Sequence, residues 1–257
     1  MSGKALVGLA PLDGCCEGFS TNSKENRALA EEFVFGSLGV DPKLFRMDGG
    51  FPVYYGANYC HAELRGPSKM PMMRPSHAFK LVLKSAIDHG VFFNKELAYG
   101  YHGTPPQCIK SILSTKIAPS KNGAVGPGIY FSPSPLYAQL YSSSTYHCAK
   151  PTTWKSKAGK TYFVDTLLQI RYQRHGCEFH DAIDEISATV GSKYCVHKLF
   201  ATAKMDIEHM IIARMPTKLC EKGVHTQALI VKFHEKNPYE AGGEWSKIVE
   251  MGKKISS

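Results

Sequence analysis

The fold is decided by residues 98–143, AYGYHGTPPQCIKSILSTKIAPSKNGAVGPGIYFSPSPLYAQLYSS. A short aromatic run at the start of this stretch ends in Tyr-His-Gly-Thr at 101–104, and Gly-Ile-Tyr-Phe-Ser follows at 128–132. Tyr137 and Tyr141 are four residues apart and share one face if their segment is helical. Glycine lets a backbone approach a ligand closely. The stretch therefore predicts a flat aromatic slot with backbone amides at its rim, suited to a planar heteroaromatic amide.

These motifs resemble the catalytic core of the poly(ADP-ribose) polymerase family, the diphtheria-toxin-like class of ADP-ribosyltransferases. The residues that carry the resemblance are the two segments 101–104 and 128–132, followed by Ala138 and Tyr141. Several motifs in a fixed order are more specific than a single pattern. The resemblance covers residues 96–257 and implies an enzyme that uses NAD+ as its co-substrate.

The resemblance also implies a role for each matching residue. His102, Tyr130 and a glutamate would form a His-Tyr-Glu catalytic triad, in which His102 binds a ribose hydroxyl on the adenosine side of NAD+. Tyr130 and Tyr141 would sandwich the nicotinamide ring. The backbone of Gly103 would bind the carboxamide, because a residue without a Cβ atom admits that approach. The remaining residues expected to contact NAD+ are Thr104, Gly128 and Ala138.

The glutamate of the triad has two candidate positions. In the family it stands at the head of a strand, with one further strand after it. Residues 205–212, MDIEHMII, fit this description with Glu208, and the strand expected at 226–233 follows. We choose Glu208, since a carboxylate at the start of an apolar strand needs a reason to be there. The competing placement puts Gln227 in the third position and leaves the site without a carboxylate.

A carboxylate beside the ribose suits the chemistry of NAD+ cleavage. Breaking the nicotinamide–ribose bond builds positive charge on the ribose carbon, and a nearby carboxylate stabilises the developing oxocarbenium ion. One family feature is missing, because Ala138 stands where many members have a serine that hydrogen-bonds the nicotinamide amide. Weaker transfer or altered inhibitor binding is expected from this change. The neighbouring Tyr137 has no explanation in the pattern.

The function expected from the resemblance is transfer of ADP-ribose, one unit at a time, from NAD+ to a macromolecular acceptor. One alternative is a catalytically inactive protein that binds NAD+ or ADP-ribose, which the Gln227 placement favours. Another is an NAD+-dependent RNA 2′-phosphotransferase, although its arginine-based phosphate site is not evident. A protein acceptor is the main expectation. The formal net charge of +9 keeps a nucleic-acid acceptor open.

Composition limits the remaining possibilities. The 257 residues contain no apolar run near 18 residues, so neither a membrane span nor a membrane partner is expected. The eight cysteines include no Cys-x-x-Cys pair, which favours reduced thiols and an intracellular protein of the cytoplasm or nucleus. His175, Cys177 and His180 are close in sequence, but their irregular spacing does not indicate a metal site.

The periodicity of the chain predicts an α+β protein with many strands and few helices. The resemblance implies the ADP-ribosyltransferase fold, in which two antiparallel or mixed sheets pack together between flanking helices. We place an N-terminal extension at 1–95 and the catalytic core at 96–257. Helices are expected at 24–38, 76–89 and 107–113. Strands are expected at 53–55, 96–102, 162–172, 210–215 and 228–233.

Overall fold

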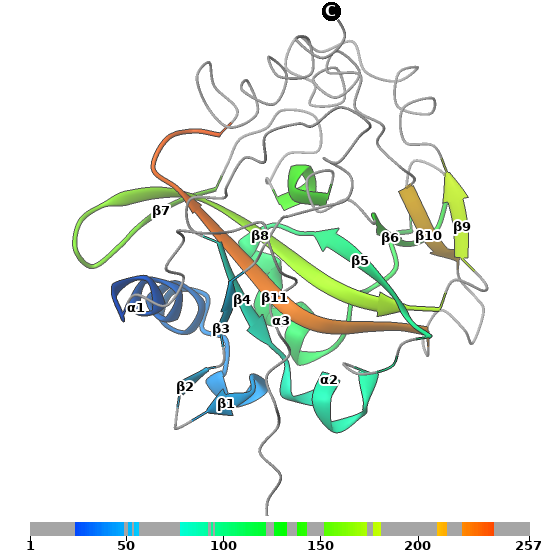
Figure 1. Cartoon of the computed structure of the whole chain (residues 1–257). Helices are drawn as coiled ribbons and strands as arrows, with labels where there is room; N and C mark the ends of the chain where they lie inside the picture. The colour runs from blue at the N-terminus through cyan, green and yellow to red at the C-terminus, as the bar shows by residue number, and fades with distance from the viewer. Residues whose placement is uncertain are drawn as a thin grey trace, which may run out of the picture.

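The computed structural model shows an α+β protein in which antiparallel sheets dominate and helices are few (Figure 1). It describes residues 24–48, 51–52, 54–56, 78–91, 94, 96–121, 126–132, 138–142, 152–173, 177–180, 210–214 and 223–238. No helix among these residues is long and apolar enough to cross a membrane.

The centre of the protein is a six-stranded antiparallel sheet with the strand order β3-β4-β11-β8-β5, to which β7 adds by pairing with β8. Its two longest strands, β8 (Thr161–Tyr172) and β11 (Val224–His234), lie side by side in the middle (Figure 1). The other strands of the sheet are β3 (Tyr54–Gly56), β4 (Ala78–Val82), β5 (Ala98–Gly103) and β7 (Thr152–Lys155).

One face of this sheet carries the main hydrophobic core. Alternate residues of the central strands point to this face, since successive side chains of a strand point to opposite faces, and they are almost wholly apolar. Helix α3 (Pro106–Ser114) contributes Ile109 to the core, and α1 (Lys24–Glu31) with the π-helix η1 (Glu32–Ser37) contributes Phe33. Fully buried members from the sheet are Phe79, Leu81, Val164, Leu168, Leu229 and Phe233.

The opposite face of the same strands is also buried, and it carries polar and charged residues beside a small apolar cluster that includes Leu167 and Ile230. Asp165, Gln169 and Arg171 of β8 are at most 7% exposed, as are Lys232 and His234 of β11. A polar group in such a place is costly unless it is hydrogen-bonded. This face must therefore contain a structured polar network, and it is the face toward which the segment around Ala138 packs.

A second, three-stranded antiparallel sheet adjoins the end of β5, at the right of Figure 1. Its order is β6-β10-β9, from β6 (Gly128–Phe131), β10 (Met210–Arg214) and β9 (Cys177–His180). The remaining elements are α2 (Lys84–Asp88), the 3-10 helices η2 (Pro42–Leu44) and η5 (Leu140–Ser142), and the two-residue strands β1 (Met47–Asp48) and β2 (Phe51–Pro52).

The expected helix at 76–89 is wrong in its first half, because residues 78–82 form strand β4 and only Lys84–Asp88 are helical. The apolar run Phe79, Leu81, Val82 and Leu83 looked like a helix buried all round. It is instead a strand covered on both faces, whose pattern periodicity cannot separate from that of a buried helix. The strands expected at 96–102, 162–172, 210–215 and 228–233 are confirmed within a few residues as β5, β8, β10 and β11.

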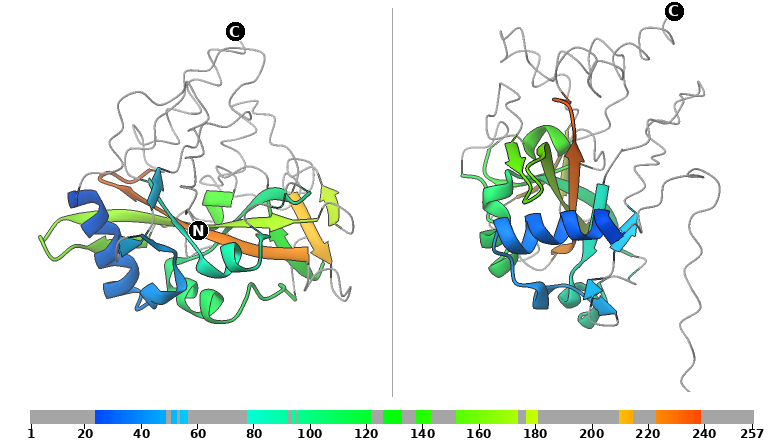
Figure 2. Two further views of the ribbon diagram at one scale, coloured as in Figure 1. Left: turned by 60° about the horizontal axis from the view of Figure 1, so that its bottom comes forward. Right: turned by 90° about the vertical axis from the view of Figure 1, so that its left-hand side faces the viewer.

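The segment assigned to an N-terminal extension contributes to the central sheet. Strand β4 pairs with β11 along five residues, and β3 extends the sheet beyond β4. The α1–η1 segment lies against the β7–β8 hairpin (Figure 2), where the Phe33 and Trp154 ring centroids are 5.2 Å apart. Trp154 Nε1 also donates to Ser37 Oγ at 2.8 Å. Residues before and after position 95 thus share one hydrophobic core.

Candidate functional site

The candidate site forms where the two sheets meet. Tyr101 of β5 and Ser132, just after β6, exchange a pair of backbone hydrogen bonds with N–O distances of 2.7 and 2.9 Å. This bridge places the Tyr-His-Gly-Thr motif beside the Gly-Ile-Tyr-Phe-Ser motif, which stand 24 residues or more apart in the sequence. A third segment, 138–142, packs against the end of β5.

His102 is joined directly to the second motif. Its Nδ1 atom lies 2.7 Å from the carbonyl oxygen of Tyr130. A carbonyl oxygen only accepts, so Nδ1 carries the proton and the neutral ring keeps a lone pair on Nε2. Burial lowers the pKa of His102, and the hydrogen bond to Tyr130 opposes this only in part. His102 is therefore neutral at pH 7, with Nε2 able to accept a hydrogen bond from a hydroxyl group.

Tyr130 is held at both ends. Its backbone carbonyl accepts from His102, and its hydroxyl donates to the Gly126 carbonyl at 2.5 Å. Gly126 has a φ of 103°, a conformation that only glycine adopts without strain. The glycine before β6 thus shapes the turn whose carbonyl holds the Tyr130 hydroxyl.

Gly103 fits closely beneath the third segment. A Cβ atom at this position would lie 1.7 Å from the Ala138 carbonyl oxygen and 3.0 Å from Tyr141 Cβ, so no side chain can be accommodated. The backbone groups of alternate residues in a strand point to the same side. Since Tyr101 directs its N–H and C=O toward Ser132, those of Gly103 point to the same outer edge of β5, away from β8.

The backbones of Thr104 and Gly128 form hydrogen bonds within the protein. Thr104 is 4% exposed, its N–H points to the Thr166 carbonyl, and its own carbonyl accepts from Thr166 Oγ1 at 2.5 Å. Gly128 exchanges two backbone hydrogen bonds with Ser120, at 2.8 and 3.0 Å. The backbones of both residues thus hold neighbouring strands and loops in place, whereas Gly103 directs its backbone groups to the outer edge of β5, away from β8.

A buried polar network fixes the third segment, and sequence reasoning missed it. Asp165 of β8 accepts from Gln139 Nε2 at 2.8 Å and from Ser142 Oγ at 2.5 Å. His234 Nε2 of β11 lies 2.8 Å from the same carboxylate, and Ser142 Oγ is also 2.7 Å from the Gln139 carbonyl. The two donors from the third segment flank Tyr141 in sequence, so Asp165 anchors this residue and Ala138 onto the sheet.

The electrostatics of the network favour an ionised Asp165. Burial alone would raise the pKa of this carboxyl group. Hydrogen bonds from His234 and Ser142, with the positive charges of His234 and Lys232, outweigh burial and hold the pKa below its usual value. An aspartate in the middle of a strongly apolar strand was the signal in the sequence. Such a residue needs buried partners, and Lys232 and His234 stand at alternate positions of the neighbouring strand.

The two candidates for the third catalytic position lie in different surroundings. Glu208 and Tyr137 fall outside the described residues. Strand β10 begins at Met210, two residues after Glu208, and pairs with β6 such that Ile212 is opposite Tyr130. Gln227 is described: it forms a bulge in β11, is 1% exposed, and its carbonyl accepts from Leu83 N–H. Strand β8 lies between β11 and β5, so Gln227 does not adjoin His102.

No group of three or more His, Cys, Asp or Glu side chains among the described residues is placed to hold a metal ion. Cys177 begins β9, where its Sγ donates to the Gln173 carbonyl oxygen at 3.3 Å, and His175 falls outside the described residues. Comparison with known proteins gives no family: neither a protein-family model nor a curated protein matches the sequence.

Proposed function

We propose that the protein is an ADP-ribosyltransferase with the fold of that class, and that it cleaves NAD+ at the nicotinamide–ribose bond and passes ADP-ribose, one unit at a time, to a protein acceptor. The hydrogen bond between His102 Nδ1 and the Tyr130 carbonyl carries the proposal. It joins the first two motifs of the family resemblance in one place and leaves His102 Nε2 as an acceptor for a ribose hydroxyl.

The outer edge of β5 supplies groups suited to the carboxamide of nicotinamide. The carboxamide has an NH2 group that donates and a carbonyl oxygen that accepts. The C=O of Gly103 can accept from the NH2 group, and its N–H can donate to the carbonyl oxygen. Tyr141 stands beside this edge, with its Cβ near the position that a Gly103 side chain would take. Tyr130, held through its hydroxyl, offers a second aromatic ring. Two rings around a flat amide are a favourable arrangement for stacking.

We assign the third catalytic role to Glu208. Two described features support this choice: β10 starts two residues later and pairs with the strand that bears Tyr130, while Gln227 is separated from β5 by β8. The carboxylate would act on the charge that develops at the ribose carbon. An interaction that is strongest in the transition state lowers the rate when removed and leaves ground-state binding nearly intact.

The test is to incubate the full chain with NAD+ labelled in its adenosine half, together with protein or RNA acceptors. We expect release of free nicotinamide and label on protein. The Glu208→Gln variant should lose transfer by at least about a hundredfold while its dissociation constant for NAD+ stays within about threefold. Binding of NAD+ without turnover in the unaltered protein would instead identify an inactive NAD+-binding protein, and removal of an RNA 2′-phosphate would identify the phosphotransferase.

His102→Asn tests the binding half of the proposal. The asparagine amide can still donate to the Tyr130 carbonyl, but it has no atom at the position of Nε2. We expect NAD+ to bind roughly tenfold more weakly to this variant. The melting temperature should change little, because the contact with Tyr130 persists. An unchanged NAD+ affinity would remove His102 from the site.

A further inference from the structure

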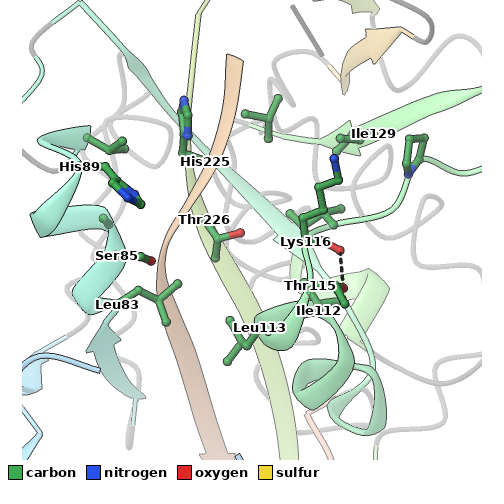
Figure 3. Close-up of a pocket in the computed structure, with 15 residues that line it drawn as sticks. Leu83, Ser85, His89, Ile112, Leu113, Thr115, Lys116, Ile129, His225 and Thr226 are labelled. Atoms are coloured by element: carbon green, nitrogen blue, oxygen red, sulfur yellow. Dashed lines mark hydrogen bonds between the residues drawn. The ribbon is translucent and has the colours of Figure 1, made fainter. Parts of the chain in front are cut away.

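A separate pocket opens beside β6, and neither His102 nor Tyr130 lines it. It lies between α2 and the segment that follows α3, with the start of β11 as its floor (Figure 3). Its volume is about 300 Å³. Ile129 lines the pocket, while the next residue, Tyr130, accepts the hydrogen bond from His102.

The interior of this pocket is apolar. Side chains from four separate parts of the chain meet there, which gives a surface able to exclude water from an apolar guest. Burial of apolar area of this kind supplies about 25 cal/mol per Å². The residues that form the apolar wall are Leu83, Ala86, Leu113, Ile117, Ile129 and Val224.

The polar side chains that line the pocket are one lysine, two histidines and three residues with a hydroxyl group. His89 and Ser85 come from the α2 side, His225 and Thr226 from β11, and Lys116 from the segment after α3 (Figure 3). No carboxylate occurs among the described residues that line it. The Lys116 ammonium beside an apolar wall favours a guest with one negative charge, to which an N–H of each imidazole ring can also donate.

We propose that this pocket binds a small apolar carboxylate, with the hydrocarbon part against the apolar wall and the carboxylate toward Lys116. The volume is at the lower end of the range for small-molecule sites, about 300–1,000 Å³, so it suits a compact molecule rather than a dinucleotide. The pocket does not include His102, Gly103 or Tyr141. It is therefore a site in addition to the proposed NAD+ site.

Octanoate is the probe for calorimetric titration of the full chain, with octanamide as the uncharged match of equal length. We expect octanoate to bind saturably and octanamide to bind roughly fivefold more weakly, since an ion pair with an exposed lysine contributes modestly. Lys116→Met should weaken octanoate by a similar factor, whereas Lys110→Met, an exposed lysine on α3 outside the pocket, should leave it unchanged. Equal affinities for the acid and the amide would overturn the proposal.

Ser85→Phe tests the location. Ser85 is exposed on α2 and lines the pocket, so a phenyl ring there can fill the cavity without disturbing the core. We expect this variant to lose octanoate binding more than tenfold while its melting temperature and its NAD+ affinity stay unchanged. Octanoate binding that survives in a folded Ser85→Phe protein would show that the carboxylate binds elsewhere.

Discussion

At Gly103 the space for a side chain is occupied by the backbone of another segment. The Ala138 carbonyl oxygen would be 1.7 Å from an added Cβ, and a backbone atom cannot rotate away as a side chain does. Gly103→Ala must therefore displace the segment that carries Ala138 and Tyr141, at a cost of about 1–3 kcal/mol. We expect NAD+ binding to fall by more than tenfold, measured by titration calorimetry.

Gly36→Ala is the matched control for this prediction. A Cβ atom on Gly36 meets nothing within 4 Å, and its φ is not in the left-handed region. This variant should keep its NAD+ affinity and lose no stability. If Gly103→Ala binds NAD+ as Gly36→Ala does, the edge of β5 is not part of a ligand site.

The protonation state of His102 gives a second prediction at the scale of one residue. Burial lowers its pKa below the usual value, so the folded state favours the neutral ring that accepts through Nε2. NAD+ affinity should be constant from pH 8 down to about 6.5, the ordinary histidine pKa, and decrease only as the pH falls further and the ring becomes charged. His102→Asn should abolish this decrease. Calorimetry across the pH range would contradict the role if both proteins showed the same profile.

At the scale of one element, the segment 138–142 is attached to the central sheet through the carboxylate of Asp165. Asp165→Asn leaves His234 and Lys232 buried beside a neutral amide, so we expect a loss of about 3 kcal/mol in unfolding free energy at pH 7. Because the pKa of Asp165 is lowered in the folded protein, its contribution is complete above the unfolded value of about 3.9 and disappears as the pH falls below it.

Urea unfolding at pH 7, 5, 4 and 3 measures this contribution. The unaltered protein should lose stability steeply below about pH 4, and Asp165→Asn should show a smaller slope. Asp41→Asn is the control, since Asp41 is exposed and only caps η2 through the Lys43 N–H, a role that asparagine also fills. Identical slopes for the unaltered protein and Asp165→Asn would show that the carboxylate does not stabilise the fold.

Long elements can be predicted from the sequence. A short strand that is buried on both faces cannot, because its pattern resembles that of a buried helix. Strand β8 is rich in apolar and β-branched residues, so the sequence predicts a strand at 162–172, and the structure confirms it as Thr161–Tyr172. The sequence predicts a helix where the structure has strand β4, because a strand covered on both faces shows no alternation. The motifs indicated His102, Gly103 and Tyr130, whereas the Asp165 network joins residues as far apart as Gln139 and His234. Such pairing depends on strand register, which no local pattern contains.

For the molecule as a whole, the two faces of the central sheet have separate tasks. One face buries the aromatic and aliphatic core against α1, η1 and α3, and so supplies most of the stability. The other face holds the charged network that anchors the third segment of the candidate site. The same strands, β8 and β11, serve both faces. Any change that removes a neighbour of β11 should therefore affect stability and ligand binding together.

A chain that starts at residue 96 tests this coupling. It lacks β4, which leaves one edge of β11 without its partner strand, and an unpaired apolar edge favours aggregation. It also lacks Phe33 and Phe79, whose ring centroids are 5.6 and 5.9 Å from that of Phe233. We expect this fragment to show no cooperative thermal unfolding by circular dichroism and no binding of NAD+.

The matched comparison is a chain that starts at residue 24, which retains every described element. It should unfold cooperatively near the melting temperature of the full chain. In the full chain, Phe33→Ala alone should lower the unfolding free energy by about 3–5 kcal/mol, because the ring contacts both Trp154 and Phe233. If the fragment 96–257 unfolds cooperatively and binds NAD+, then β5, β8 and β11 form a stable sheet without β4. Residues 1–95 would then be an extension that the catalytic core does not need in order to fold.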